Sequence, residues 1–397
     1  MSSSSILRKA ENAPLSIAER DRRYGLVRAT LAERGIGAVI VTGTQLVYLS
    51  GGMPGEQFGI LSADGGEPFT QMLEWRHLSD IPAEVVLEAQ DWVTDLRSGR
   101  NPGPVVERLK ELKLETGTVG FAGPFAQRAY AFIKKELPSA TLVDANDILN
   151  NVRTVKSGEE IDLIDRANQV FNAAIEAIHA KGRPGMLGSE LMHIGVSAMW
   201  DAGGDIDSTF SINFDRIPAQ NPVLASICLN RRIQEGEIAT LTAHSHYQNY
   251  AGHSDQEIAF GDPNPRHVAM FDEVKKVRKA VLSVVRAGAT QRDLVDAYQE
   301  ACSQGGFQTS DHSQIHQYGL DVPEFPGMAY RIEDAKGGKG LGGGGNFTLT
   351  SGMVYSISPT VIDEATGDLM LGGTSLAITD NGYRELGARE VDLLVVS

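Results

Sequence analysis

The alternation of hydrophobic and polar positions in the first part of the chain predicts helices separated by short strands. Ser16–Glu19 has the form of a capping box that starts a helix, and Gly35 stands where that helix would end. Residues 38–42 are apolar and mostly β-branched, which is typical of a buried strand, and 116–121 show a second strand pattern. A further helix is predicted over 126–137. This repetition of helix and strand predicts a small α/β domain.

A second capping box, at Ser157–Glu160, opens a long amphipathic helical pattern, which the Gly-Arg-Pro-Gly run at 182–185 ends. A similar helical pattern covers 265–286. Segments with strand character lie between and after these helices, at 238–243, 353–357 and 375–378. These elements predict a second domain that combines long helices with a largely antiparallel sheet. We therefore expect two domains, residues 1–150 and residues 151–397.

The size and composition of the chain narrow its class. At 397 residues it is too long for one hydrophobic core, and 42% hydrophobic with 22% charged residues is ordinary for a globular protein. No apolar run is long enough for a membrane span, and the N-terminus lacks the apolar core of a secretory signal. Two cysteines, Cys228 and Cys302, cannot form a disulfide framework. These features favour a cytoplasmic protein without a membrane partner.

Charge and glycine content argue against two further kinds of partner. The chain holds 36 basic against 51 acidic residues, a net charge of −15, and no dense basic segment that would attract nucleic acid. Residues 337–345 are mostly glycine, but they lack the Gly-Lys-Ser/Thr ending and the following helix of a phosphate-binding loop. We therefore expect a mobile loop at 337–345. Since nucleic acid is a poor candidate partner, we expect a small molecule as the substrate.

Short segments spread over the second domain occur in the order found in a known family. They are Gly236–Thr242, Tyr247, Tyr250, Gly261–Pro263, His316–Val322, Ser351–Pro359 and Ile378–Tyr383. Together they resemble the pita-bread fold family of creatinase, prolidase, aminopeptidase P and methionine aminopeptidase. Val47–Gly51 is similar to the N-terminal domain of the creatinase and prolidase branch. The resemblance implies a small N-terminal creatinase-like α/β domain, a C-terminal pita-bread catalytic domain of the α+β class, and a homodimer with active sites near the protomer interface.

The resemblance also locates the positions where the family's metallopeptidases hold two divalent ions with two Asp, one His and two Glu. An ungapped alignment of 236–261 places the two Asp positions at Thr242 and His253, and the His and the two Glu positions are His316, Ser358 and Gly373. Hydroxyls and a glycine cannot replace the carboxylates that neutralise and bridge two ions. We therefore expect no metal and no cofactor. In this loss the chain resembles the family's metal-free members, creatinase and ectoine hydrolase.

A catalytic cluster without metal is predicted from three side chains. His253 and Asp255 lie two residues apart on an expected strand, so both point to the same face. His316 comes from the segment that the family places in the cleft, and a neutral imidazole can move protons between water and substrate. Alternatively, His253 is a core histidine with satisfied nitrogens and Asp255 pairs with a cation. A third possibility is that both histidines and Asp255 hold one zinc ion.

Substrate-binding residues are expected around this cluster. Gln220 falls where creatinase has its catalytic His, and Asp255 where it has an important Glu. The full substrate-binding set that we predict is Gln220, Thr242, Ser358, Phe214, Arg331, Trp75 and Arg76. Phe214 is otherwise a core residue, and the arginines are otherwise surface residues. Exposure is expected for His244 and His246, and a structural role for His312.

These observations predict a metal-independent hydrolase that cleaves a C–N bond other than an ordinary peptide bond in a small polar molecule by general acid–base catalysis. Three alternatives stay open: a lyase or other acid–base enzyme on the same scaffold, a pseudoenzyme that only binds, and a mononuclear metallo-aminopeptidase. A scaffold alone does not specify a reaction.

Overall fold

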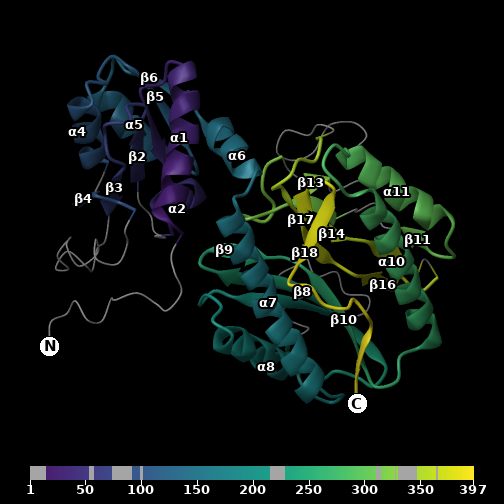
Figure 1. The fold of residues 1–397 in the computed structure, drawn as a ribbon. Helices are drawn as coiled ribbons and strands as arrows, with labels where there is room; N and C mark the ends of the chain where they lie inside the picture. Colours follow the sequence, from purple (N-terminus) through teal and green to yellow (C-terminus); the bar gives the residue numbers. More distant parts are fainter. Residues whose placement is uncertain are drawn as a thin grey trace. The chain divides into compact units, whose positions relative to one another are not determined.

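The computed structural model describes residues 15–52, 58–73, 92–98, 102–214, 229–309, 314–326, 328–329, 347–363 and 365–397. The chain divides into two compact units, residues 1–153 and residues 154–397 (Figure 1). The elements of the first unit are α1 (Ile17–Glu33), β1 (Ala38–Val41), α2 (Gly43–Ser50), β2 (Phe58–Ser62), β3 (Thr70–Leu73), β4 (Asp95–Ser98), α4 (Gly103–Glu111), β5 (Thr118–Ala122), α5 (Gln127–Glu136), β6 (Thr141–Asp144) and α6 (Asn146–Thr154).

The first unit is a mixed sheet with helices, as the pattern of its sequence predicts. The strand order is β4-β3-β2-β1-β5-β6, in which β1 pairs with β5 in parallel and with β2 antiparallel. The β1 strand lies in the middle of the sheet, and all four of its apolar residues are buried. A continuous apolar run of this kind suits a strand that is covered on both faces. The α1 helix begins where expected, since the Ser16 side chain accepts a hydrogen bond from the Glu19 N–H.

The second unit contains long helices and antiparallel sheets. Its helices are α7 (Gly158–Lys181), α8 (Gly188–Asp201), α10 (Pro265–Val284) and α11 (Gln291–Ser303). Its strands are β7 (Thr209–Phe214), β8 (Glu237–Tyr247), β9 (Tyr250–Gly252), β10 (Asp255–Phe260), β11 (Gln308–Thr309), β12 (Gln314–Gln317), β13 (Met328–Ala329), β14 (Val354–Ser358), β15 (Thr360–Ile362), β16 (Leu369–Leu371), β17 (Thr374–Thr379), β18 (Gly382–Leu386) and β19 (Leu394–Val396). The predicted capping box of α7 is present, with reciprocal bonds between Ser157 and Glu160.

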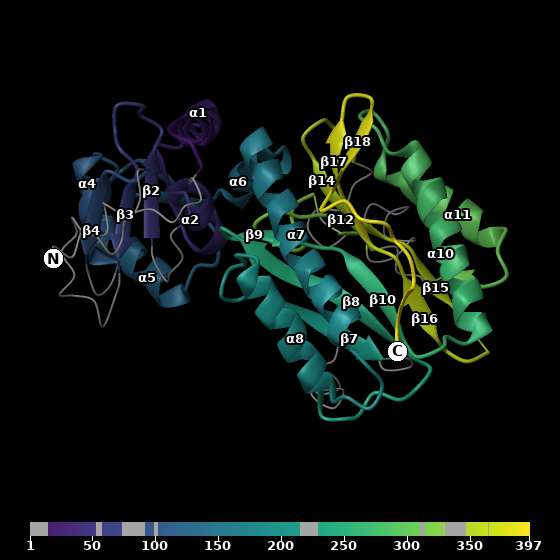
Figure 2. The same cartoon turned by 60° about the horizontal axis from the view of Figure 1, so that its bottom comes forward.

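Two sheets of the second unit carry the residues of interest. One has the order β19-β10-β8-β7, with β9 paired to β8, and the other has the order β13-β12-β14-β17-β18 (Figure 2). A third, smaller sheet joins β11, β15 and β16. β8 is longer than the predicted strand at 238–243, because its second half pairs with β9 in a tight hairpin. The expectation of a largely antiparallel sheet is confirmed. The exception among the described strands of this unit is the β10–β19 pair, which is parallel.

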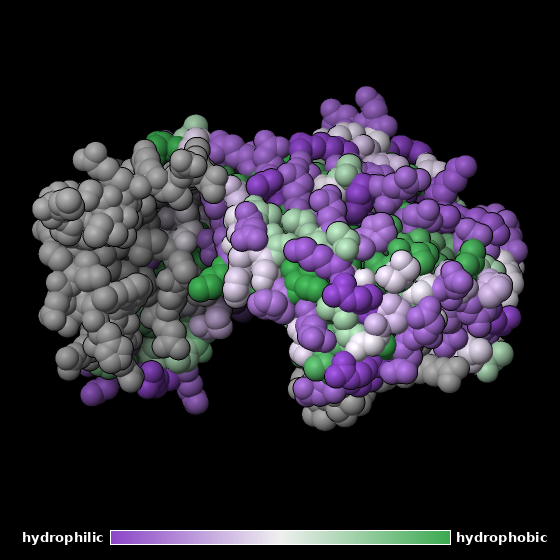
Figure 3. Space-filling view, turned by 90° about the horizontal axis from the view of Figure 1, so that it is seen from below, coloured by the Kyte–Doolittle hydropathy of each residue, from purple (hydrophilic) through white to green (hydrophobic). Residues whose placement is uncertain are grey.

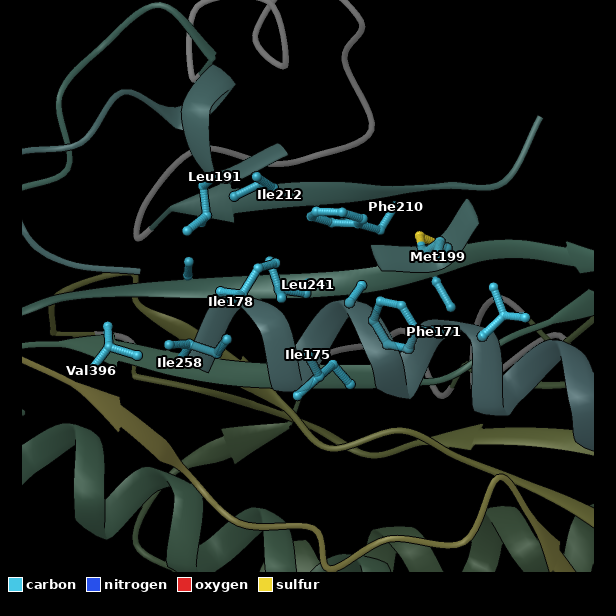
Figure 4. Packing of buried hydrophobic residues seen from close by; sticks show 14 of the residues in the cluster. Phe171, Ile175, Ile178, Leu191, Met199, Phe210, Ile212, Leu241, Ile258 and Val396 are labelled. Carbon is cyan, nitrogen blue, oxygen red and sulfur yellow. The ribbon is translucent and has the colours of Figure 1, made fainter. Parts of the chain in front are cut away.

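One hydrophobic core of the second unit lies between the α7 and α8 helices and one face of the first of these sheets, and another lies between α10, α11 and the second sheet. Phe171, Ile175 and Ile178 recur at helical spacing on α7 and pack against Leu241 and Ile258 of the strands (Figure 4). Burying these side chains removes apolar surface from water, the main favourable term in folding. The α7 face of this sheet is therefore apolar, and its opposite face is available for polar side chains.

The surface is mainly polar on the side that Figure 3 shows. Hydrophilic side chains cover most of the second unit there, and hydrophobic ones form small groups. Among the helices that the structure describes, none is long and apolar enough to cross a membrane.

Candidate functional site

A row of polar side chains lies on the face of β8 and β10 that is turned away from α7. Strand residues alternate between faces, so Leu241 and Ala243 enter the hydrophobic core while Thr240 and Thr242 point the other way. Across the antiparallel register, Thr242 lies opposite Asp255, and Thr240 lies opposite Glu257. The Thr240 hydroxyl contacts both Glu257 carboxylate oxygens, at 2.9 and 2.8 Å. Four polar side chains therefore face the second sheet.

Asp255 is fixed by two hydroxyl groups at positions where the resemblance expects metal-binding carboxylates. Thr242 Oγ1 donates to Asp255 Oδ1 at 2.7 Å, and Ser358 Oγ donates to Asp255 Oδ2 at 2.6 Å. Asp255 is 1% exposed, so these are the bonds that compensate for taking its carboxylate out of water. A Cβ placed on Gly373 would lie 2.0 Å from Asp255 Oδ2. The Asp255 carboxylate thus occupies the space that a side chain at position 373 would need.

Two histidines from distant segments meet beside this carboxylate. The ring centroids of His253 and His316 are 4.8 Å apart, and both residues are buried. Burial lowers the pKa of His316 to about 3, and the neighbouring His253 lowers it further in the same direction. Burial also lowers the pKa of His253, against an opposing contribution from Asp255. Both imidazoles are therefore neutral at pH 7.

The ring nitrogens of this pair have different partners. Nδ1 of His253 lies 3.4 Å from the Ala243 carbonyl oxygen, and Nδ1 of His316 lies 3.4 Å from the Gln317 carbonyl oxygen. A carbonyl oxygen can only accept, so each Nδ1 carries the proton and each Nε2 carries the lone pair. The Nε2 atoms are therefore the basic or metal-binding nitrogens of the pair.

Several residues that support the pair were not predicted from the sequence. Asn168 Oδ1 accepts from the backbone N–H of His253 at 3.2 Å, and its amide donates to the Tyr318 hydroxyl at 3.1 Å. The Tyr318 ring lies edge-on to His253, with 6.0 Å between centroids. Glu257 was missed as well, although its spacing of two residues from Asp255, matching Thr240 and Thr242, was a signal for it.

Arg389 is a further unpredicted residue. Its guanidinium donates to the Asp255 carbonyl oxygen and to Gln256 Oε1, so it holds the start of β10 from the side. Burial lowers the pKa of Arg389 to about 10, which leaves it charged at pH 7. No feature of its local sequence distinguishes it from a surface arginine.

The predicted site residues divide into three groups. His253, Asp255, His316, Thr242 and Ser358 are brought together as described above. Phe214 lies on the same face of its sheet as Ala239, within the hydrophobic core and under the Arg231 guanidinium, so the structure places it away from the polar row. The remaining predictions lie outside the described residues: Trp75, Arg76, Gln220, His312, Arg331 and the glycine-rich segment 337–345.

The two neighbouring histidines of β8 differ in their surroundings. His244 is exposed, as expected, whereas His246 is half-buried, with Nδ1 3.6 Å from an oxygen of Asp207. Desolvation by the surrounding protein and, next, the nearby His253 lower the pKa of His244. His244 is therefore a neutral imidazole that solvent can reach.

The donors do not fit a two-ion centre. Thr242 and Ser358 bring hydroxyls, His253 brings an imidazole and Gly373 brings no side chain, so all four carboxylates of the two-ion site are missing. Within the described ranges, no group of three or more His, Cys, Asp or Glu side chains is arranged to hold a metal ion. For one ion the donors fit in kind: two neutral imidazoles are suitable ligands, and each Asp255 oxygen can accept beyond its one hydroxyl bond.

Comparisons with known proteins identify the family. Residues 162–397, more than half of the chain, match the model of metallopeptidase family M24, and residues 23–155 match the creatinase/prolidase N-terminal domain. The chain belongs to the M24 family. The two matches lie one in each unit of the fold, and the expected pita-bread architecture is confirmed.

Several similar proteins are named as Xaa-Pro dipeptidases. The Xaa-Pro dipeptidase of Pyrococcus horikoshii is 21% identical over 380 residues, covering 91% of this chain and 95% of that protein. The Xaa-Pro dipeptidase of Pyrococcus furiosus is 22% identical over 298 residues, 72% of this chain and 78% of that protein. Among solved structures, the Xaa-Pro dipeptidase from Bacillus anthracis superposes with a TM-score of 0.77 at 18% identity, covering 95% of this chain and all of that one.

These matches correct the function expected from the sequence. The prediction of a metal-independent, creatinase-like hydrolase of non-peptide C–N bonds is wrong, because the matching family is one of metallopeptidases and the full-length relatives are named as dipeptidases. The expected similarity to the metal-free members gave too much weight to the four carboxylates lost at the metal positions. The assignment to the hydrolase class is retained.

Proposed function

We propose that this chain hydrolyses the peptide bond of a dipeptide-sized substrate, with Xaa-Pro dipeptides as the first class to test. Two findings support the proposal: the M24 match over 162–397 and the relationship to Xaa-Pro dipeptidases along almost the whole chain. Of the alternatives left open by the sequence, a mononuclear metallo-aminopeptidase agrees best with these relatives.

The observation that carries the proposal is the meeting of His253, His316 and Asp255. If the chain binds a single divalent ion, these are the side chains whose chemistry suits it, although their present arrangement does not itself form a metal site. Such an ion would polarise the scissile carbonyl and lower the pKa of bound water. The chain's own contribution is to keep both imidazoles neutral by burial and to direct their lone pairs through the carbonyl contacts of Nδ1. Thr242 and Ser358 hold the carboxylate in place.

The test is release of proline from Ala-Pro by purified protein that has been stripped with a chelator and then supplied with Mn²⁺, Co²⁺ or Zn²⁺. We expect hydrolysis to return with one of these ions and elemental analysis to find about one ion per chain, in keeping with a mononuclear site. Ala-Ala serves as a dipeptide without proline. Failure of every ion to give hydrolysis of either dipeptide by folded protein would contradict the proposal.

Variants locate the activity in the proposed site. His316→Ala and Asp255→Ala should lower kcat/KM on the order of 10²-fold or more, because each removes a ligand or a proton-transferring group. His193→Ala, an exposed histidine of α8, is the matched control and should stay within about threefold of the parent, since surface changes away from a site are usually mild. Equal activity of His316→Ala and the control would move the reaction elsewhere in the chain.

A further inference from the structure

The polar row of β8 and β10 continues beyond Thr242 and Asp255 toward the hairpin. Thr242 pairs with Asp255 on one side, and Ser245 pairs with Gly252 on the other. Between them, the Ala243 N–H donates to the Ser254 carbonyl oxygen at 2.9 Å, so the register is unbroken. His244 therefore lies directly opposite His253, on the same face, where cross-strand Cβ atoms are about 4.5–5.5 Å apart.

Three imidazoles consequently follow one another across the strands. His316 and His253 are in ring contact at 4.8 Å, and His244 is the cross-strand neighbour of His253. Exposure changes along this row: His316 is 2% exposed and His253 is 7% exposed, whereas His244 is open to solvent. His244 is therefore the solvent-exposed end of this row of imidazoles.

We propose that His244 is a substrate-binding residue of this site, and that its ring N–H donates a hydrogen bond to the carboxylate of the bound dipeptide. The inference rests on the proposed function and adds a recognition group to it. A carboxylate suits this position because an imidazole N–H is a donor, and because His244 lies at the solvent-exposed end of the row, where a charged group keeps part of its hydration. His244 is not one of the five positions at which the family's metallopeptidases hold their ions.

Binding of N-acetyl-L-proline tests this role without requiring turnover. This probe has an amide and a carboxylate, and N-acetyl-L-prolinamide is the matched probe that lacks the carboxylate. In calorimetric titrations the parent protein should bind the acid more tightly than the amide. His244→Leu should lose about tenfold or more in affinity for the acid, the effect expected for one hydrogen bond to a charged group. His244→Gln keeps an N–H donor and should retain most of the preference.

Kinetics with Ala-Pro give the second readout, because removing a binding contact should raise KM more than it lowers kcat. His193→Leu, on the exposed surface of α8, is the control for an exposed histidine replaced by leucine. Two results would overturn the inference: equal affinity of the parent protein for acid and amide, or the same affinity for the acid in His244→Leu as in the parent. If the acid preference depends on His244 but no dipeptide is cleaved, the proposed function fails and the binding role stands.

Discussion

Replacing Gly373 by alanine would place a methyl group where the Asp255 carboxylate now lies. The added Cβ would be 2.0 Å from Asp255 Oδ2 and 2.5 Å from Ser358 Oγ, distances that no stable contact allows. Gly373 does not have a positive φ angle, so its backbone conformation is one that alanine can adopt. The substitution therefore tests one feature, the occupation of this space by Asp255.

The expected cost follows from the contacts that must give way. Asp255 has to move, which breaks the 2.6 Å hydrogen bond from Ser358 to a buried charged group. Losing such a bond costs about 1.5–3 kcal/mol, and overpacking a well-filled interior costs about 1–3 kcal/mol. We expect Gly373→Ala to lower the free energy of unfolding of the second unit by about 3 kcal/mol or more.

Hydrogen exchange of β10 and β14 amides in increasing urea measures this loss in the second unit by itself, since the two units need not unfold together. Gly382→Ala is the matched control, because a Cβ on Gly382 meets nothing within 4 Å. A cost for Gly373→Ala below about 0.5 kcal/mol, as for an ordinary surface change, would refute the placement of Asp255.

A double-mutant cycle sharpens the result. In an Asp255→Ala background the closer of the two contacts is gone and only the one with Ser358 Oγ remains, so Gly373→Ala should cost clearly less there. The coupling between the two substitutions should then be well above the roughly 0.3–0.5 kcal/mol deviation seen for independent sites. Additive costs would show that Gly373 and Asp255 do not touch.

Three further predictions concern stability and assembly. Lys156 and Glu324 form a buried ion pair with 2.6 Å between Nζ and Oε2, so Lys156→Met should lower the free energy of unfolding in urea by about 3–5 kcal/mol. The double variant Lys156→Met/Glu324→Leu should recover most of this loss. A loss below about 1 kcal/mol in the single variant would contradict a buried pair. The pKa of His316 is lowered from 6.5 to about 3 in the folded protein, so between these pH values only the unfolded state binds the extra proton. With a chelator present, the free energy of unfolding should therefore fall as the pH drops below 6.5, by up to about 1.4 kcal/mol per pH unit. His316→Gln should flatten that slope, and an unchanged slope would mean that His316 is protonated in the fold. From the resemblance we also propose a homodimer burying more than about 1,200 Å², which light scattering of a stable monomer at micromolar concentration would disprove.

Much of the fold follows from local sequence. Ser16 and Ser157 start α1 and α7, because each side-chain oxygen accepts from the N–H three residues on, and in α7 the Glu160 carboxylate also accepts from the Ser157 N–H. The segment 238–243 was predicted to be a strand, and in β8 its residues alternate between an apolar and a polar face. The two-residue spacing of His253 and Asp255 predicted a common face for these two side chains.

Tertiary structure alone decided how these side chains are used. His253, His316 and Ser358 come from β-segments far apart in the chain, and their distances depend on how the two sheets pack. Phe214 was predicted to bind substrate, yet the register of β7 on β8 turns its side chain into the core. Protein interiors are close-packed, so the space left by the absent side chain of Gly373 is filled by a neighbouring group. In this structure that group is the Asp255 carboxylate. A sequence records the missing side chain, but only the packed structure shows which neighbour fills its place.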